Sequence, residues 1–219
     1  LVRFAGSGNR RGGVTIESAA PTVQDTEHQI NRIGVVLTGP ATPRLERVVI
    51  GSSQFVPLAM TLDADPVLVD NVLSFRDNRY DAIGLLGGVP AADAVLRPRS
   101  FGRDDGSTIS NLTYVLIEDL TVPQGRHLTI RPGVVVKGDV WWQDLIVQGR
   151  LTAVGTADSA IVFTSIYDDN HGQPRDTNRD GTQTSPQRGN WGGIVFEQTA
   201  TANSRLERAL LRYGQASRP

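Results

Sequence analysis

The segment 36–45 reads VLTGPATPRL, and two other segments in the same half of the chain follow its pattern. Residues 14–23 read VTIESAAPTV, and residues 60–68 read MTLDADPVL. Each segment has apolar residues at alternate positions, then a small residue, a proline and a second apolar stretch. Alternation with a period of two predicts short β-strands, and proline fits the corners between strands because it cannot donate to a strand ladder. The three prolines lie 22 and 23 residues apart (Pro21, Pro43, Pro66).

A regular spacing of this length predicts a solenoid of short strands. One turn of such a chain cannot bury its apolar face alone, whereas stacked turns, about 4.8 Å apart, bury a continuous column of side chains. No long stretch keeps apolar residues at the helical spacing i, i+3, i+4 and i+7. We therefore predict an all-β fold, a parallel β-helix or β-solenoid, with about 22–25 residues per coil and about eight to ten coils.

The second half of the chain repeats less regularly but keeps the alternation. We divide the sequence into regular coils at 1–88, an irregular connecting loop at 89–112 and a second β-helix module at 113–219, all on one continuous core. The second module contains a long Asp/Asn/Gly-rich loop at 166–190. Its predicted inward-facing residues are Leu120, Val122, Leu128, Ile130, Val134 and Val136.

Composition excludes several classes of function. A net charge of -1 and an isoelectric point near 6.3 give no electrostatic reason to expect nucleic acid or an anionic membrane as a partner. Cysteine is absent, which excludes disulfides, thiolate catalysis and zinc–thiolate sites. No run of about 18 apolar residues occurs, so the sequence predicts no membrane span in this segment.

The two ends of the chain resemble each other. Leu1-Val2-Arg3-Phe4 matches Leu210-Leu211-Arg212-Tyr213 in character, at a displacement of 209 residues. This match predicts that the chain is about one unit of a longer tandem-repeat protein. Its expected partners are then neighbouring repeats of the same chain or other copies of it.

The second half also resembles a known kind of module. The motifs are LTVPQGRHLTIRPGVVVKGD, LIVQGRLTAVGTADSAIVFTS and, after the loop, GNWGGIVF. Over residues 114–215 they resemble the right-handed parallel β-helix segments of large secreted bacterial cell-surface, adhesin-like proteins. The resemblance implies an extracellular or cell-surface location and a structural or adhesive role as stalk, fibre or adhesin. The same coil serves polysaccharide-binding and polysaccharide-degrading proteins, which are the alternative.

The long loop contains a candidate metal site. Asp176, Asn178 and Asp180 alternate and are followed by Gly181, which matches the start of an oxygen-ligand calcium loop. Gln187 stands where an EF-hand has a bidentate glutamate, so we do not predict an EF-hand. In the resembling modules such loops look like calcium sites, which extends the candidate ligands to Asp168 and Asp169. The opposing interpretation is that Asp and Asn simply favour turns. If calcium binds, we expect a structural role.

Two further interpretations concern carbohydrate. Asp168, Asp169 and Asp176, with arginines in the same loop, could supply the acids of a polysaccharide lyase or glycoside hydrolase, but no catalytic motif surrounds them. Trp141 and Trp142 are possible carbohydrate contacts. On a strand these neighbours would face opposite sides, with one exposed, or both would be partly buried under the 166–190 loop. We predict no catalytic residue.

Overall fold

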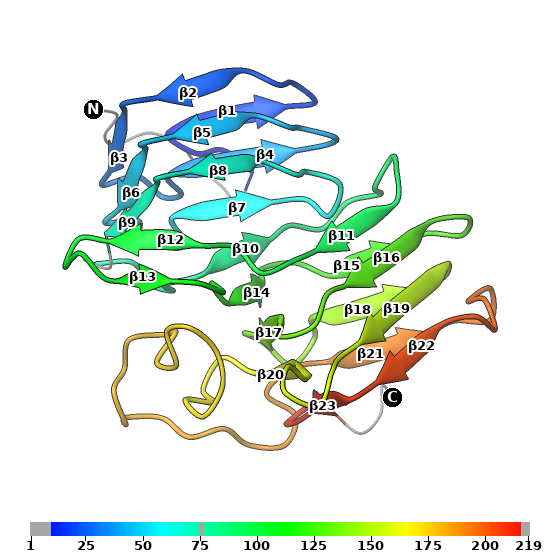
Figure 1. Ribbon diagram of the computed structural model, residues 1–219. Helices are drawn as coiled ribbons and strands as arrows, with labels where there is room; N and C mark the ends of the chain where they lie inside the picture. Colours follow the sequence, from blue (N-terminus) through cyan, green and yellow to red (C-terminus); the bar gives the residue numbers. More distant parts are fainter. Residues whose placement is uncertain (1–9, 75–76, 216–219) are drawn as a thin grey trace.

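The computed structural model describes residues 10–74 and 77–215. Within these ranges the chain is all-β and contains no helix, and its strands form stacked, mainly parallel sheets (Figure 1). The predicted repeat of Leu1–Phe4 against Leu210–Tyr213 depends on residues that lie outside the described part. No helix in that part is long and apolar enough to cross a membrane.

One sheet runs the whole length of the described chain and joins its two halves. Its eight strands are β1 (Val14–Glu17), β4 (Val35–Thr38), β7 (Leu58–Met60), β10 (Ile83–Leu85), β14 (Tyr114–Leu116), β17 (Val135–Gly138), β20 (Ile161–Ser165) and β23 (Ala209–Leu211). All of its neighbouring strands are parallel. Val14 pairs with Val35, Val35 with Leu58 and Leu58 with Ile83, so successive partners lie 21, 23 and 25 residues apart.

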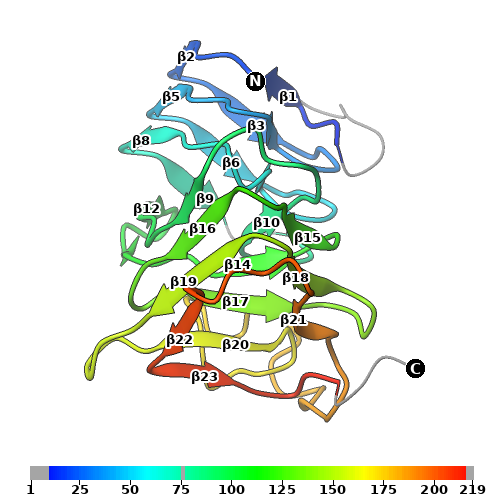
Figure 2. The same cartoon turned by 90° about the vertical axis from the view of Figure 1, so that its right-hand side faces the viewer.

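The other sheets are shorter and differ between the two halves. The first half has β2 (Thr22–Gln24), β5 (Arg44–Glu46) and β8 (Val67–Val69) in one sheet. Its other sheet has β3 (Glu27–Gln29), β6 (Val49–Gly51), β9 (Val72–Ser74), β12 (Phe101–Arg103) and the antiparallel β13 (Thr108–Ile109). The second half has β15 (Leu120–Val122), β18 (Asp144–Val147) and β21 (Gly193–Phe196) in one sheet. Its other sheet has β11 (Ala94–Leu96), β16 (His127–Ile130), β19 (Arg150–Val154) and β22 (Arg205–Glu207). Of these, β16, β19 and β22 step down one face in Figure 2.

The repeated prolines begin the strands of one sheet. Pro21 and Pro43 immediately precede β2 and β5, and Pro66 precedes β8. Proline has no amide hydrogen, but its carbonyl still accepts: Arg44 N donates to Pro21 O (3.0 Å) and Val67 N to Pro43 O (2.9 Å). The spacing of the prolines therefore equals the spacing of strands that pair in register.

The main core lies between the sheets. The six residues predicted to face inward in the second half all belong to it. A second apolar cluster covers the opposite face of the eight-stranded sheet and includes Val36, Ala59 and Val115. Because both faces of the middle strands of this sheet are buried, strands such as β4 and β7 read as continuous apolar runs rather than as strict alternation.

Residues 89–112 differ from the irregular loop that the sequence predicted. They contain β11, β12 and β13, and β11 and β12 pair with strands of different sheets. The strands are two or three residues long, and prolines and glycines lie close to them. Such short strands leave too few residues for an alternating pattern to show.

Candidate functional site

The 166–190 loop leaves the end of β20 and returns to β21, and in Figure 1 it forms the long yellow and gold excursion beside the sheets. Backbone hydrogen bonds tie it to residues just before β10 and β14 of the eight-stranded sheet. Asp81 N donates to Thr177 O (2.9 Å), and Thr113 N donates to Gln173 O (3.1 Å). Gln173 N in turn donates to the Thr113 hydroxyl (2.8 Å). The loop is therefore attached to the stack at several points.

Lys137, the only lysine of the chain, is the buried centre of this attachment. It lies in register with Val115 on β14 and Thr164 on β20, where the second apolar cluster gives way to polar side chains. Its ammonium donates to the backbone oxygens of Asp168 (2.9 Å) and Arg175 (2.8 Å). Burial lowers the pKa of Lys137 to about 8, against the attraction of the nearby aspartates.

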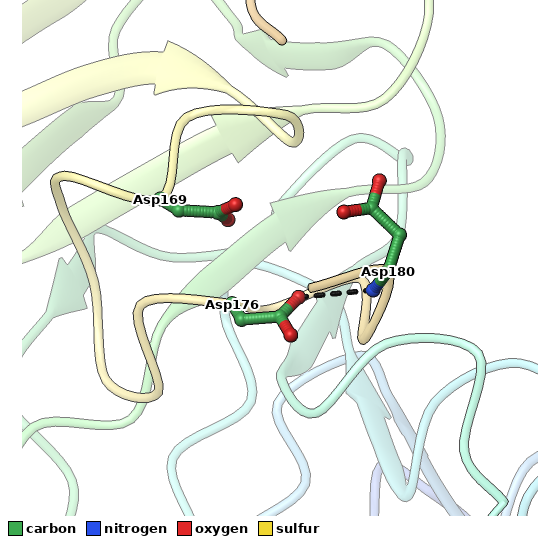
Figure 3. Close-up of side chains that lie close together, drawn as sticks. All are labelled: Asp169, Asp176 and Asp180. Atoms are coloured by element: carbon green, nitrogen blue, oxygen red, sulfur yellow. Dashed lines mark hydrogen bonds between the residues drawn. The ribbon is translucent and has the colours of Figure 1, made fainter. Parts of the chain in front are cut away.

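Three aspartates of the loop converge above this lysine. Asp169, Asp176 and Asp180 each place a carboxylate oxygen within 4.8 Å of the other two, and Figure 3 shows their side chains gathered around one space. Asp176 accepts hydrogen bonds from the amides of Asp180 and Gly181, both at 3.0 Å. These bonds fix the turn that the sequence DTNRDG predicted. The cluster can hold a metal ion.

Several oxygens in this cluster have no hydrogen-bond donor. Oδ1 of Asp169, Oδ1 of Asn178 and Oδ1 of Asp180 are buried and have no partner among the described residues. Burial raises the pKa of Asp169; Lys137 opposes the rise, and the carboxylates of Asp176 and Asp180 add to it. Buried acceptors without donors are costly, and a cation at the aspartate cluster would provide a partner for the oxygens of Asp169 and Asp180.

Asp168 was predicted as a ligand, but its carboxylate has other partners. It is fully buried, and Oδ2 accepts from the Thr164 hydroxyl (2.6 Å) while Oδ1 accepts from the amide and side chain of Asn170 (both 3.1 Å). Burial would raise its pKa, but these hydrogen bonds outweigh burial and the pKa is lowered. Asp168 thus shapes the start of the loop and is not part of the converging group.

The adjacent tryptophans do not lie on a strand, so the expectation that they face opposite sides of one does not apply. Trp141 and Trp142 lie in the turn between β17 and β18, and each is 56% exposed. Their rings meet edge to face, with centroids 5.3 Å apart. Together with Trp191, Arg188 and Tyr213 they line a groove of about 1150 Å³ beside β21. A turn removes the alternation that a strand would impose.

Two contributors to this region were not predicted. Asp81, which is 4% exposed, lies opposite the loop, with its carboxylate 3.7 Å from Arg179 Nε. Burial raises the pKa of Asp81 to about 7, although Asn78 and Arg179 favour its charged form. The single lysine was visible in the sequence, but only the register of β17 shows that it faces the loop. Asp81 carried no such signal.

No family model matches the chain, and no curated protein or solved structure has significant similarity to it.

Proposed function

We propose that the chain is a right-handed parallel β-helix segment of a large extracellular surface protein, with a structural or adhesive role and no catalysis. The observation that carries this proposal is the eight-stranded sheet from β1 to β23, which extends through both halves over one core. A stack of this kind distributes a pulling force over many backbone hydrogen bonds. It also offers long lateral faces for contacts with other molecules, as a stalk, fibre or adhesin requires.

Calcium is the proposed occupant of the aspartate cluster, and its role is structural. Calcium takes six to eight oxygen ligands in flexible geometries, and carboxylates, amide oxygens and water all serve. Asp169, Asp176, Asp180 and Asn178 supply four such side chains here. The cation would add a fixed point near the middle of the loop, beyond the contacts of Lys137. Extracellular modules bind calcium with dissociation constants of roughly 0.1–1 mM, and we expect the same range here.

The three converging acids suit a cation, and no catalytic motif surrounds them as sugar hydrolysis would require. Retaining glycosidases hold their two carboxyl groups about 5–5.5 Å apart, and inverting ones about 6.5–9.5 Å. The three aspartates converge within 4.8 Å. One small cation can contact an oxygen of each aspartate and neutralise their mutual repulsion.

Asp169→Asn tests the calcium site because it should change the stability of the metal-free protein and that of the calcium-bound protein in opposite directions. Asp169 makes no hydrogen bond that the turn needs, and its charge is disfavoured by burial and neighbouring carboxylates. In chelator we expect the variant to be at least as stable as the wild type. In 10 mM calcium we expect the wild type to gain about 1.4–2.7 kcal/mol, as for a ligand at 10–100 times its dissociation constant, and the variant to gain much less.

The matched control is Asp158→Asn, which removes an exposed carboxylate outside the loop. It should behave like the wild type with and without calcium. Equal melting temperatures for the wild type in chelator and in calcium would contradict the metal assignment. They would leave the stacked-strand architecture untouched, because the core does not depend on the loop cation.

A second candidate function is carbohydrate binding, and the groove at Trp141 and Trp142 favours it. Two half-exposed indoles in edge contact, with Arg188 at the same groove, are suited to stacking on sugar rings. Tryptophan fluorescence should then change on titration with a surface polysaccharide. The change should disappear in the double variant Trp141→Ala/Trp142→Ala; silence across a panel of neutral and acidic polysaccharides would reject this function.

A further inference from the structure

The sheet that contains β16 and β19 has one face in the core and one face toward solvent. Alternate residues of these two strands belong to the main core, so the residues between them point outward. The outward residues are His127 and Thr129 on β16 and Arg150, Thr152 and Val154 on β19. Both strands lie inside their sheet, between β11 and β22, so this lateral face is formed by neighbouring coils along the side of the stack (Figure 2).

This lateral face has a local excess of positive charge. Arg150 lies in register with His127. Arg126, immediately before β16, and Arg131, immediately after it, are both exposed. None of these three arginines has an ion-pair partner among the residues that the structure describes. No outward residue of β11, β16 or β19 is acidic. The net charge of -1 for the whole chain therefore hides a basic surface.

The acids around this face are engaged elsewhere or lie at its corners. Asp93 precedes β11, and its Oδ1 accepts a hydrogen bond from the amide of His127 (3.0 Å). On β22, Glu207 accepts from Arg205 Nε (2.6 Å). Asp158 is exposed in the turn after β19. The positive charge in the middle of the face is thus not matched by a carboxylate of the chain.

Arg150 carries a buried donor that has no acceptor. Its Nε makes no hydrogen bond within the described residues, and an unpaired donor on a charged group is costly. Next to it, His127 Nε2 lies 2.9 Å from the Thr152 hydroxyl and 3.4 Å from the Thr129 hydroxyl. Burial and then the charge of Arg150 lower the pKa of His127, while Asp93 opposes the shift. An anion bound here would accept from the guanidinium and offset its repulsion of a protonated imidazole.

We propose that this lateral face binds an acidic polysaccharide, with one carboxylate or sulfate of the polymer on Arg150 and others on Arg126 and Arg131. A guanidinium presents planar, charged donors that suit oxyanions. Thr129 and Thr152 place hydroxyl groups on the same face, where sugar hydroxyls can pair with them. The inference goes beyond the proposed structural role and gives its adhesive form a partner.

The composition of the face favours a polysaccharide over other polyanions. Its outward strand positions contain no tryptophan, tyrosine or phenylalanine on which the bases of a single-stranded nucleic acid could stack. Their apolar side chains are Val95 and Val154, which form no large apolar anchor for insertion into a membrane. Hydroxyl and guanidinium groups in register along adjacent strands instead suit a polymer of hydroxyls and acids. This face is also separate from the groove at Trp141 and Trp142.

Isothermal titration calorimetry at low salt tests the proposal with polygalacturonate and dextran sulfate, and neutral dextran serves as the uncharged polymer. We expect at least one acidic polymer to bind, and the comparison shows whether carboxylate or sulfate is preferred. Arg150→Gln should weaken binding about tenfold or more, because a charge-assisted hydrogen bond is lost. Arg131→Gln changes an exposed side chain, so it should fold normally and still weaken binding. Arg11→Gln removes the same charge from an exposed position on another coil and should bind like the wild type.

The imidazole of His127 gives a readout that general attraction between charges would not move. Followed by NMR, the pKa of His127 should rise when the acidic polymer binds, because the anion offsets the charge of Arg150. The double variant Trp141→Ala/Trp142→Ala should bind the acidic polymer like the wild type. Loss of binding in that variant would place the polymer in the tryptophan groove and overturn the proposal.

Three other results would overturn it. One is equal affinity for the wild type, Arg150→Gln and Arg11→Gln, which would show unspecific attraction. Another is tighter binding of DNA or of anionic lipid vesicles than of either acidic polysaccharide. The third is no binding of either acidic polymer. If calcium still stabilises the protein in that case, the polysaccharide site fails while the proposed function stands.

Discussion

Replacing Lys137 by methionine should change how the stability of the protein depends on pH. The lysine side chain is fully buried, and burial lowers its pKa from 10.5 to about 8. Between these values the unfolded chain binds a proton that the folded chain does not, so stability rises with pH across this window. A shift of this size corresponds to about 3 kcal/mol, since one pKa unit is about 1.4 kcal/mol. The cost of burying the charge is thus complete below pH 8 and absent above pH 10.5.

The measurement is urea unfolding followed by circular dichroism, in chelator, at pH 7.5 and pH 10.5. Subtracting the free energy of unfolding of Lys137→Met from that of the wild type removes the contributions of the tyrosines and other groups that titrate in this range. We expect this difference to move in favour of the wild type by about 3 kcal/mol as the pH rises. Val115→Met is the matched control, because Val115 is the buried register partner of Lys137 on β14. Its difference from the wild type should be the same at both pH values. A flat difference for Lys137→Met would contradict the claim that burial lowers the pKa of Lys137 in the folded protein.

Three other predictions follow from the same structure. Burial raises the pKa of Asp81 to about 7, so the stability of the wild type relative to Asp81→Asn should be highest below pH 4 and fall as the pH rises through 7, measured by urea unfolding. Gly138→Ala adds a methyl group that overlaps Trp191, which stacks on Phe163. The substitution should lower the free energy of unfolding by about 1–3 kcal/mol and change tryptophan fluorescence. Unchanged stability would contradict this packing. Trp141→Ala should alter stability by about 0.5 kcal/mol or less, because the side chain is half exposed, and a large loss on thermal unfolding would show a packing role.

The repeats of the first half could be predicted because each strand of one sheet begins after a proline at a fixed spacing. The spacing of Pro21, Pro43 and Pro66 gives the register in which these strands pair. The alternating apolar residues beside them indicate which side chains face the core. The continuation beyond residue 88 was harder. There β11 and β12 are each three residues long and pair with strands of different sheets. No local sequence pattern reveals this pairing.

The candidate metal site was likewise only partly visible in the sequence. Local turn chemistry made Asp176, Asn178 and Asp180 visible, since alternate oxygen ligands before a glycine have one compact geometry. Asp169 joined them only by resemblance, and Asp168 was included although its carboxylate bonds to Thr164 and Asn170. Whether a neighbouring aspartate points into or away from a cluster depends on tertiary hydrogen bonds that sequence does not show. Lys137 illustrates this limit, because its importance comes from the loop that covers it.

Hydrogen exchange of the loop with and without calcium tests the central claim most directly. If a cation joins Asp169, Asp176 and Asp180, amides from residue 169 to residue 181 should exchange more slowly in calcium than in chelator. Amides of β17 and β20, whose protection comes from the parallel ladder, should exchange equally in both. Identical exchange of the loop in calcium and in chelator would contradict the claim that calcium holds it in place.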